Sequence, residues 1–263
     1  MGSEAKFLVD VGMRDLPFPM RVISKKDPGG QPTVADISIT ARIMQSFEAR
    51  WIDSFTQIVH EHRDRIGTET LRTNVQDYIR ELNATSVTID FAYPYFAEKL
   101  TPVSGETCLV KYNCNYSVKA PTLTGPPKVT FHIEVPCITT YPASSAATPG
   151  GLFGQLSVLR IGTESEKEVY VEDLVDIVDR HALSPVYSFL GEDDQAAIIQ
   201  KVHSEERTSV EVTDKVKSDL AHRSGMTWYS VRCANYGMLH SYSTMVGTEK
   251  SSWVPYSGEA DEI

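Results

Sequence analysis

The order of the expected strands and helices is the feature that most constrains what this chain can fold into. Alternating apolar and polar residues predict strands, and apolar residues spaced three or four apart predict helices. In the first part of the chain these patterns predict two strands, two helices and two further strands, at residues 19–24, 33–43, 51–62, 68–82, 86–96 and 106–118. A Pro- and Gly-rich connector, residues 120–127, then interrupts the pattern.

The same order of elements returns after the connector. Two strands are expected first, then helical segments with a break near Ser204, then two strands, at residues 129–141, 153–161, 171–181, 193–222, 227–234 and 238–246. Runs of strands followed by runs of helices predict an α+β fold with antiparallel sheets. We therefore expect two fused ββααββ modules, residues 1–125 and 126–247, followed by an acidic flexible tail, residues 248–263.

A four-stranded sheet with two helices on one face leaves two strand edges exposed. Such edges are usually covered by pairing with another chain. The pattern therefore predicts a homo-oligomer, either a dimer or a tetramer.

The charge balance and hydropathy exclude several classes of partner. The chain carries 35 acidic against 25 basic residues, a net charge of -10, and has no run rich in Lys or Arg. This argues against binding to nucleic acid, which requires a basic surface. No apolar run reaches the roughly 20 residues that span a bilayer, and the N-terminus lacks a signal-peptide pattern. We expect a cytoplasmic protein with no membrane partner, whose four cysteines are reduced.

Two segments resemble one family in particular. Residues 91–99 read FAYPYFAEK and residues 102–105 read PVSG, similar to the family segment FPYFIEK..PVSG. Val135-Pro136 with residues 141–144 (YPAS) is similar to the family's VPVTSLCPCS. Weaker agreement extends from Val11 to His240, so the chain resembles the zinc-dependent type IB GTP cyclohydrolases. The resemblance implies the tunnelling fold, in which subunits form barrels and bind purine- or pterin-like rings at their interfaces.

The zinc ligands of that family are not found at the matching positions. The family's Cys-Pro-Cys falls on Tyr141-Pro142-Ala143, its histidine on Phe153, and its carboxylate on Gln200. The glutamate that anchors the substrate falls on Gly237. Zinc is held in proteins by thiolate, imidazole or carboxylate, so the comparison predicts neither a metal nor another cofactor.

Three residues are candidates for acid/base catalysis. His240 is retained from the family segment, and an imidazole titrates near neutral pH. Tyr242 is two residues further along the same expected strand, so both side chains are expected on one face. Glu98 follows an aromatic-rich strand, and burial against Tyr93, Tyr95 and Phe96 would raise the pKa of its carboxyl and let it serve as an acid. The alternatives are a half-buried strand histidine, ordinary strand packing, and a surface ion pair between Glu98 and its neighbour.

Five residues are candidates for contact with a ligand. They are Tyr141, Ser144, Phe153, Gln200 and Gly237. If the family pocket persists, Tyr141 and Phe153 line it and make it more apolar, which favours a flatter and less charged ligand than GTP. If the pocket is filled, the two rings are part of the core.

Three functions follow from these residues. The first is a metal-independent, GTP cyclohydrolase-like enzyme acting on a small cyclic or heteroaromatic metabolite by cyclisation, dehydration or isomerisation, in specialised biosynthesis. The second is a non-catalytic pseudoenzyme or partner subunit that binds a pterin or purine. The third is a GTP cyclohydrolase with relocated metal ligands, drawn from His203, His240 and Glu205 or Glu206.

Overall fold

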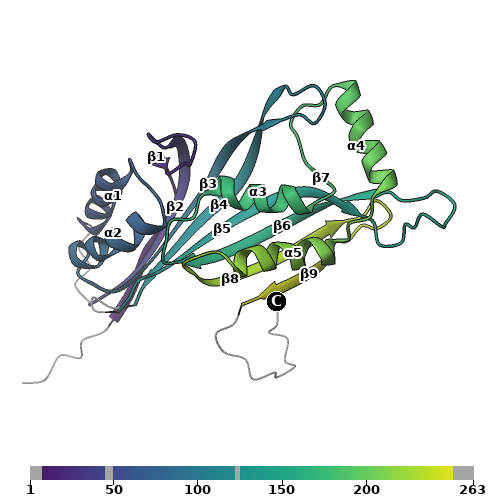
Figure 1. Cartoon of the computed structure of the whole chain (residues 1–263). Helices are drawn as coiled ribbons and strands as arrows, with labels where there is room; N and C mark the ends of the chain where they lie inside the picture. Colours follow the sequence, from purple (N-terminus) through teal and green to yellow (C-terminus); the bar gives the residue numbers. More distant parts are fainter. Residues whose placement is uncertain (1–7, 45–49, 122–124, 251–263) are drawn as a thin grey trace, which may run out of the picture.

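The chain forms one antiparallel sheet with helices packed against it, as the expected α+β class requires (Figure 1). The computed structural model describes residues 8–44, 50–121 and 125–250. The strands are β1 (Leu8–Val22), β2 (Gln31–Met44), β3 (Ala84–Leu100), β4 (Thr107–Ala120), β5 (Lys128–Thr140), β6 (Gly154–Ser165), β7 (Ser184–Pro185), β8 (Met226–Tyr236) and β9 (Thr244–Glu249). The helices are α1 (Arg50–His62), α2 (Thr68–Glu81), α3 (Val171–His181), α4 (Glu192–Ser204) and α5 (Ser209–Ala221).

The strands follow one another across the sheet almost in chain order. The order is β1-β2-β3-β4-β5-β6-β8-β9, with the short β7 paired to β5. Strands β4 and β5 pair from Asn113–Glu134 to Lys119–Lys128, so the sheet is continuous across the connector. Within the described sheet, β1 and β9 are the two outer strands.

Side chains alternate between two faces of the sheet. In Figure 1 α2, α3 and α5 lie over one face of the sheet, where α2 packs on β3, β4 and β5, and α5 packs on β8 and β9. Phe91, Phe131 and Ile133 are almost fully buried there, and each such side chain contributes about 1.5–3 kcal/mol to folding. The intervening positions, among them His132 and Ser230, point to the opposite face, called here the open face.

Most of the expected elements are confirmed. From residue 31 to residue 236 their observed bounds lie within four residues of the expected ones, including the break between α4 and α5. Strand β1 begins earlier than the expected strand at residues 19–24, because an irregularity interrupts the alternating pattern in its first part. Asp15 has a positive φ of 56° beside a register shift between Met13 and Leu16, and Pro17 and Pro19 are tolerated because the strand lies at an edge.

The prediction of the last strand, residues 238–246, is wrong over its first half. Strands β8 and β9 pair only as far as Asn235 and Thr244, so residues 237–243 form the connection and not a strand. A turn there is closed by the His240 amide, which donates to the Gly237 carbonyl at 3.4 Å. Strand β9 continues to Glu249, and residues 251–263 of the expected tail lie outside the described residues.

The cysteines are packed in the core, as expected. Cys108, Cys114, Cys137 and Cys233 are all free and buried. Burial raises the pKa of the Cys233 thiol to about 11 and raises those of Cys114 and Cys137 further, so these thiols are protonated at neutral pH. Among the described residues, no helix combines the length and the apolar character needed to cross a bilayer.

Candidate functional site

Three of the predicted ligand-contact residues meet in the connection between β5 and β6. The Tyr141 amide donates to the Phe153 carbonyl at 2.9 Å, and the two rings stack with centroids 4.9 Å apart and an interplanar angle of 18°. The Ser144 hydroxyl donates to the Tyr141 carbonyl at 2.7 Å. Tyr141 and Ser144 are each only 6% exposed. The connection is therefore held by its own hydrogen bonds around a stacked aromatic pair.

Gly237 brings the end of β8 against the same pair. A Cβ atom built on Gly237 would lie 2.6 Å from Cε2 of Tyr141, closer than two carbon atoms can approach without displacement. The tyrosine ring therefore occupies the space that a side chain at position 237 would need. In Figure 1 the β5–β6 and β8–β9 connections both extend from the end of the sheet that carries α4.

A chain of buried polar side chains joins the strands behind this pair. Ser157 Oγ donates to Asn235 Oδ1 at 2.8 Å and lies 2.7 Å from Thr139 Oγ1. Gln155 Nε2 donates to Thr139 Oγ1 at 3.3 Å, and Asn235 Nδ2 donates to Ser209 Oγ on α5 at 3.1 Å. These neutral groups fix β5, β6 and β8 relative to one another. These residues were not predicted as a group, although polar residues at the core-facing positions of three strands could have revealed them.

His240 and Tyr242 are brought together, but not by a strand. Their rings stack with centroids 4.8 Å apart and an interplanar angle of 17°. Both residues are exposed in the 237–243 connection, Tyr242 to 60%. The predicted contact between the two residues therefore exists, while its expected structural basis was wrong. The pair lies a few residues from Gly237 and is open to an approaching molecule.

Gln200 takes no part in the aromatic cluster. It is exposed on α4, and no hydrogen bond joins it to Tyr141 or Phe153 in the described part of the chain. Its neighbour His203 reaches the cluster instead, because Nδ1 of His203 lies 2.5 Å from the Leu152 carbonyl. The imidazole thereby ties α4 to the residue that precedes Phe153.

Glu98 is not buried by aromatic rings, so that expectation was wrong. It is exposed on β3, whereas Tyr93 and Tyr95 are buried on the opposite face of the same strand. The adjacent Lys99 is buried instead, with its side chain only 8% exposed. It pairs with Asp179, because its Nζ lies 2.5 Å from Oδ2 of that residue. In the described part of the chain, no hydrogen bond or ion pair joins Glu98 to His240.

The residues at the family's ligand positions do not fit zinc. Tyr141 and Phe153 present stacked rings, and Gln200 presents a neutral amide on an exposed helix face. Among the described residues of one chain, no group of three or more His, Cys, Asp or Glu side chains could hold a metal ion. The donor set at these positions is therefore unlike that of a protein zinc site.

Gly237→Ala is expected to lower the free energy of unfolding by about 2 kcal/mol, because the added methyl group must displace the Tyr141 ring. In a Tyr141→Ala background the same change should cost less than about 0.5 kcal/mol, since the obstructing ring is gone. Urea unfolding of the four proteins gives the coupling. Gly29→Ala is a control, because its Cβ would meet only Asp27 Oδ1 at 3.2 Å. Equal costs in both backgrounds would contradict the proposed clash.

Comparison with solved structures identifies the fold. The chain superposes on a uricase from Bacillus fastidious with a TM-score of 0.58 and 11% identity, over 92% of this chain and 93% of the other. The uricase from Arthrobacter globiformis gives a TM-score of 0.51 at 6% identity, covering 98% of this chain and 96% of that one. At such identities the likeness concerns the fold alone, and the expected tunnelling fold is confirmed.

Comparison with protein sequences identifies the family. The chain is 26% identical over 239 residues to the GTP cyclohydrolase FolE2 of Pelobacter propionicus, covering 91% of each. It is 27% identical over 240 residues to the FolE2 of Geotalea uraniireducens, covering 91% of this chain and 87% of the other. None of these names specifies a metal. The sequence model of type I GTP cyclohydrolase FolE2 matches residues 4–246, and the chain therefore belongs to the FolE2 family.

Proposed function

We propose that this protein is a GTP cyclohydrolase-like enzyme that acts on a small cyclic or heteroaromatic metabolite without zinc at the family's ligand positions. Membership of the FolE2 family supports chemistry on a nitrogen heterocycle. One observation carries the metal-independent part: the stacked rings of Tyr141 and Phe153 occupy positions where the resemblance implies zinc ligands. The reaction class is acid/base work, namely cyclisation, dehydration or isomerisation, in a specialised biosynthetic pathway of the cytoplasm.

In this proposal His240 is the acid/base. An imidazole can accept a proton on one nitrogen and donate one from the other, so it can move a proton between two atoms of a ring. The stacked phenol of Tyr242 fixes the plane of the imidazole. Tyr141 and Phe153 provide a flat apolar boundary, and Ser144 holds that boundary in place through the Tyr141 carbonyl. Gln200 offers an exposed amide from α4 for substrate recognition.

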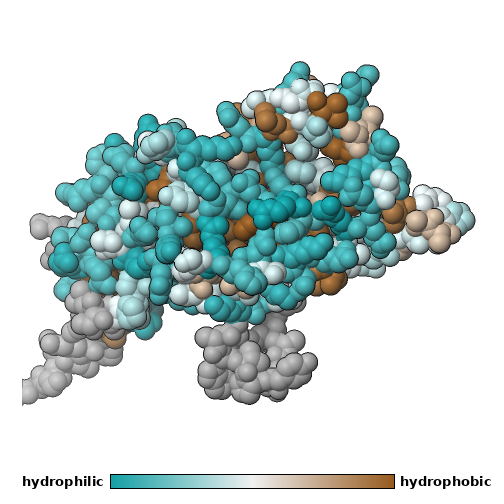
Figure 2. Space-filling model, viewed as in Figure 1, coloured by the Kyte–Doolittle hydropathy of each residue, from teal (hydrophilic) through white to brown (hydrophobic). Residues whose placement is uncertain are grey.

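The proposal includes a homo-oligomer, a dimer or tetramer in which residues 1–125 and 126–247 act as two modules. Strands β1 and β9 each have one unpaired side in the described sheet, and such edges invite pairing with another copy. Large apolar side chains are exposed at Leu100, Val103 and Phe189. Figure 2 shows hydrophobic residues gathered where α4 and the β3–β4 connection lie, as at many protein–protein interfaces. Glu98 would join the site only from a second copy.

A second candidate function is binding without turnover, as a pseudoenzyme or partner subunit. It is favoured by the exposure of His240 and Tyr242 in one chain, because acid/base catalysis usually requires groups shielded from water. The third candidate, relocated metal ligands among His203, His240, Glu205 and Glu206, lacks a cluster within the described residues of one chain. Such a site would have to be assembled between subunits.

A turnover assay on metal-analysed protein separates the three candidates. The substrates are GTP, guanine and neopterin, each with and without added zinc, manganese or iron(II), and products are followed by ultraviolet absorbance and mass spectrometry. We expect conversion of at least one heterocycle at a rate unchanged by chelator. Formate release from GTP only with added metal would support relocated ligands. Tight binding with no conversion of any of the three would support the binding protein.

A further inference from the structure

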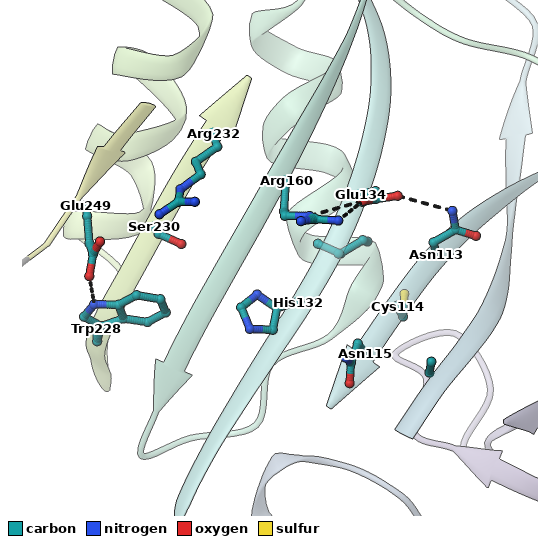
Figure 3. Close-up of a pocket in the computed structure, with 12 residues that line it drawn as sticks. Asn113, Cys114, Asn115, His132, Glu134, Arg160, Trp228, Ser230, Arg232 and Glu249 are labelled. Carbon is teal, nitrogen blue, oxygen red and sulfur yellow. Dashed lines mark hydrogen bonds and ion pairs between the residues drawn. The ribbon is translucent and has the colours of Figure 1, made fainter. Parts of the chain in front are cut away.

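The open face carries a row of polar residues that the proposed function does not use. Asn115 on β4, His132 on β5, Gly162 on β6 and Ser230 on β8 are successive cross-strand partners. Asn115, His132 and Ser230 line a hollow of about 450 Å³, which is within the range of small-molecule pockets. Figure 3 shows these side chains, with Trp228 and Arg232 on the strand that carries Ser230.

Gly162 is buried beneath two of these side chains. A Cβ atom built there would lie 2.8 Å from Ser230 Oγ and 2.9 Å from His132 Nδ1. The two polar side chains therefore reach over the glycine from both sides and cover its backbone, and they can do so because position 162 has no side chain.

The polar groups around the hollow fall into two sets. Those of the first set already satisfy one another: Arg160 Nη2 is 2.5 Å from Glu134 Oε1, and Trp228 Nε1 donates to Glu249 Oε1 at 2.8 Å. Lys128 lies over the Trp228 ring at 5.8 Å from its centroid. These pairs form walls of fixed position.

The second set has no partners among the described residues. Asn115 Oδ1 is enclosed and accepts no hydrogen bond. His132, Ser230 and Arg232 line the same hollow, and none of them makes a side-chain hydrogen bond or ion pair there. Burial, aided by the charge of Arg160, lowers the pKa of His132, so its ring is neutral at pH 7 and offers one donor and one acceptor. An enclosed polar atom without a partner, as Asn115 Oδ1 is, is costly, and a ligand can satisfy it.

We propose that this hollow binds a planar N-heterocycle that carries an N–H group on one edge and an anionic substituent on another. The enclosed Asn115 oxygen requires a donor, which the ring N–H supplies. The Arg232 guanidinium binds the anionic substituent, because charge-assisted hydrogen bonds are the stronger ones. His132 and Ser230 bind polar atoms between these two points, and the Trp228 indole provides an aromatic wall. This site is distinct from the one at Tyr141 and does not depend on its chemistry.

Fluorescence titration with pterin-6-carboxylate tests the proposal, with unsubstituted pterin as the probe that lacks the anion. We expect saturable binding of pterin-6-carboxylate to the wild-type protein. Arg232→Gln should weaken it by about tenfold or more, since a hydrogen bond to a charged group is lost, and should leave pterin binding unchanged. Gly162→Ala should weaken both probes, because the added methyl group must displace the His132 and Ser230 side chains. Lys111→Gln, which removes an exposed charge from the same face outside the hollow, is the matched control.

A His240→Ala variant separates this site from the one at Tyr141. Binding that is retained in His240→Ala and lost in Arg232→Gln supports the open-face site, whether or not the protein turns over any heterocycle. Binding lost in His240→Ala but unchanged in Arg232→Gln and Gly162→Ala would place the probe at the other site and overturn the inference. Absence of saturable binding to the wild-type protein would overturn it as well.

Discussion

The His240→Ala variant is expected to lose about 10²–10⁴-fold in kcat on whichever of GTP, guanine and neopterin the wild-type protein converts, because this is the range that a positioned acid/base contributes. Tyr242→Phe keeps an aromatic ring that can stack on the imidazole, which lies 4.8 Å away, so it should retain most of the activity. Tyr242→Ala removes the stacked ring, and its kcat should lie between those of His240→Ala and Tyr242→Phe. Steady-state rates measured from pH 5 to pH 9 test this order.

A surface histidine far from the site controls for the loss of an imidazole as such. His60 is exposed on α1, and His60→Ala should leave kcat within twofold of wild type. If His240→Ala also stays within twofold and its pH profile matches that of wild type, His240 is not the acid/base. Tight ligand binding with unchanged affinity would then favour the non-catalytic alternative.

The fold could be predicted because its information is local. Alternation along β4 and β5 and helical periodicity in α2 and α3 are properties of a dozen consecutive residues, and they gave nearly correct bounds. The meeting of Tyr141, Phe153 and Gly237 is different, since it joins segments almost a hundred residues apart. The sequence indicated that meeting only through resemblance to a family whose site lies there.

Two errors at the site have physical explanations. Glu98 was expected beside Tyr93, Tyr95 and Phe96. Residues separated by an odd number along a strand point to opposite faces, so the sequence already argued against the two tyrosines, while Phe96 shares the face of Glu98 but is itself 44% exposed. His240 and Tyr242 were assigned to a strand because the connection after Gly237 contains Met238 and Leu239, which are apolar but exposed. Apolar residues at an interface with another chain and apolar residues in a core look the same in a sequence.

The hollow on the open face could not have been predicted. Its residues share no motif, and they become neighbours only through the register of β4, β5, β6 and β8. A shift of one residue in β5 would turn His132 to the helical face, and a shift in β8 would turn Ser230 there. Hydrogen bonding between distant strands sets that register, and periodicity alone does not encode it.

Lys99 belongs to the segment that carries the family resemblance, and the structure gives it a structural role that has a large expected effect. Its ammonium is 2.5 Å from Asp179 on α3, and the two side chains are 8% and 20% exposed. Removing one partner of a buried pair leaves the other charge uncompensated. Lys99→Met is therefore expected to lower the free energy of unfolding by about 3 kcal/mol at pH 8. Lys111→Met, at an exposed position on β4, should cost less than about 0.5 kcal/mol.

The pH dependence distinguishes this pair from simple packing. Burial raises the pKa of Asp179, and the charge of Lys99 opposes that rise, so the pKa should be higher still in Lys99→Met. A carboxyl whose pKa is raised in the folded state favours folding at acidic pH, and that contribution is lost as the pH rises through the folded pKa. The deficit of Lys99→Met should therefore be smaller at pH 5 than at pH 8, and Asp179→Asn should relieve part of it at pH 8. Urea unfolding at both pH values measures this, and a deficit that is independent of pH would show that Lys99 contributes through its aliphatic chain and not through its charge.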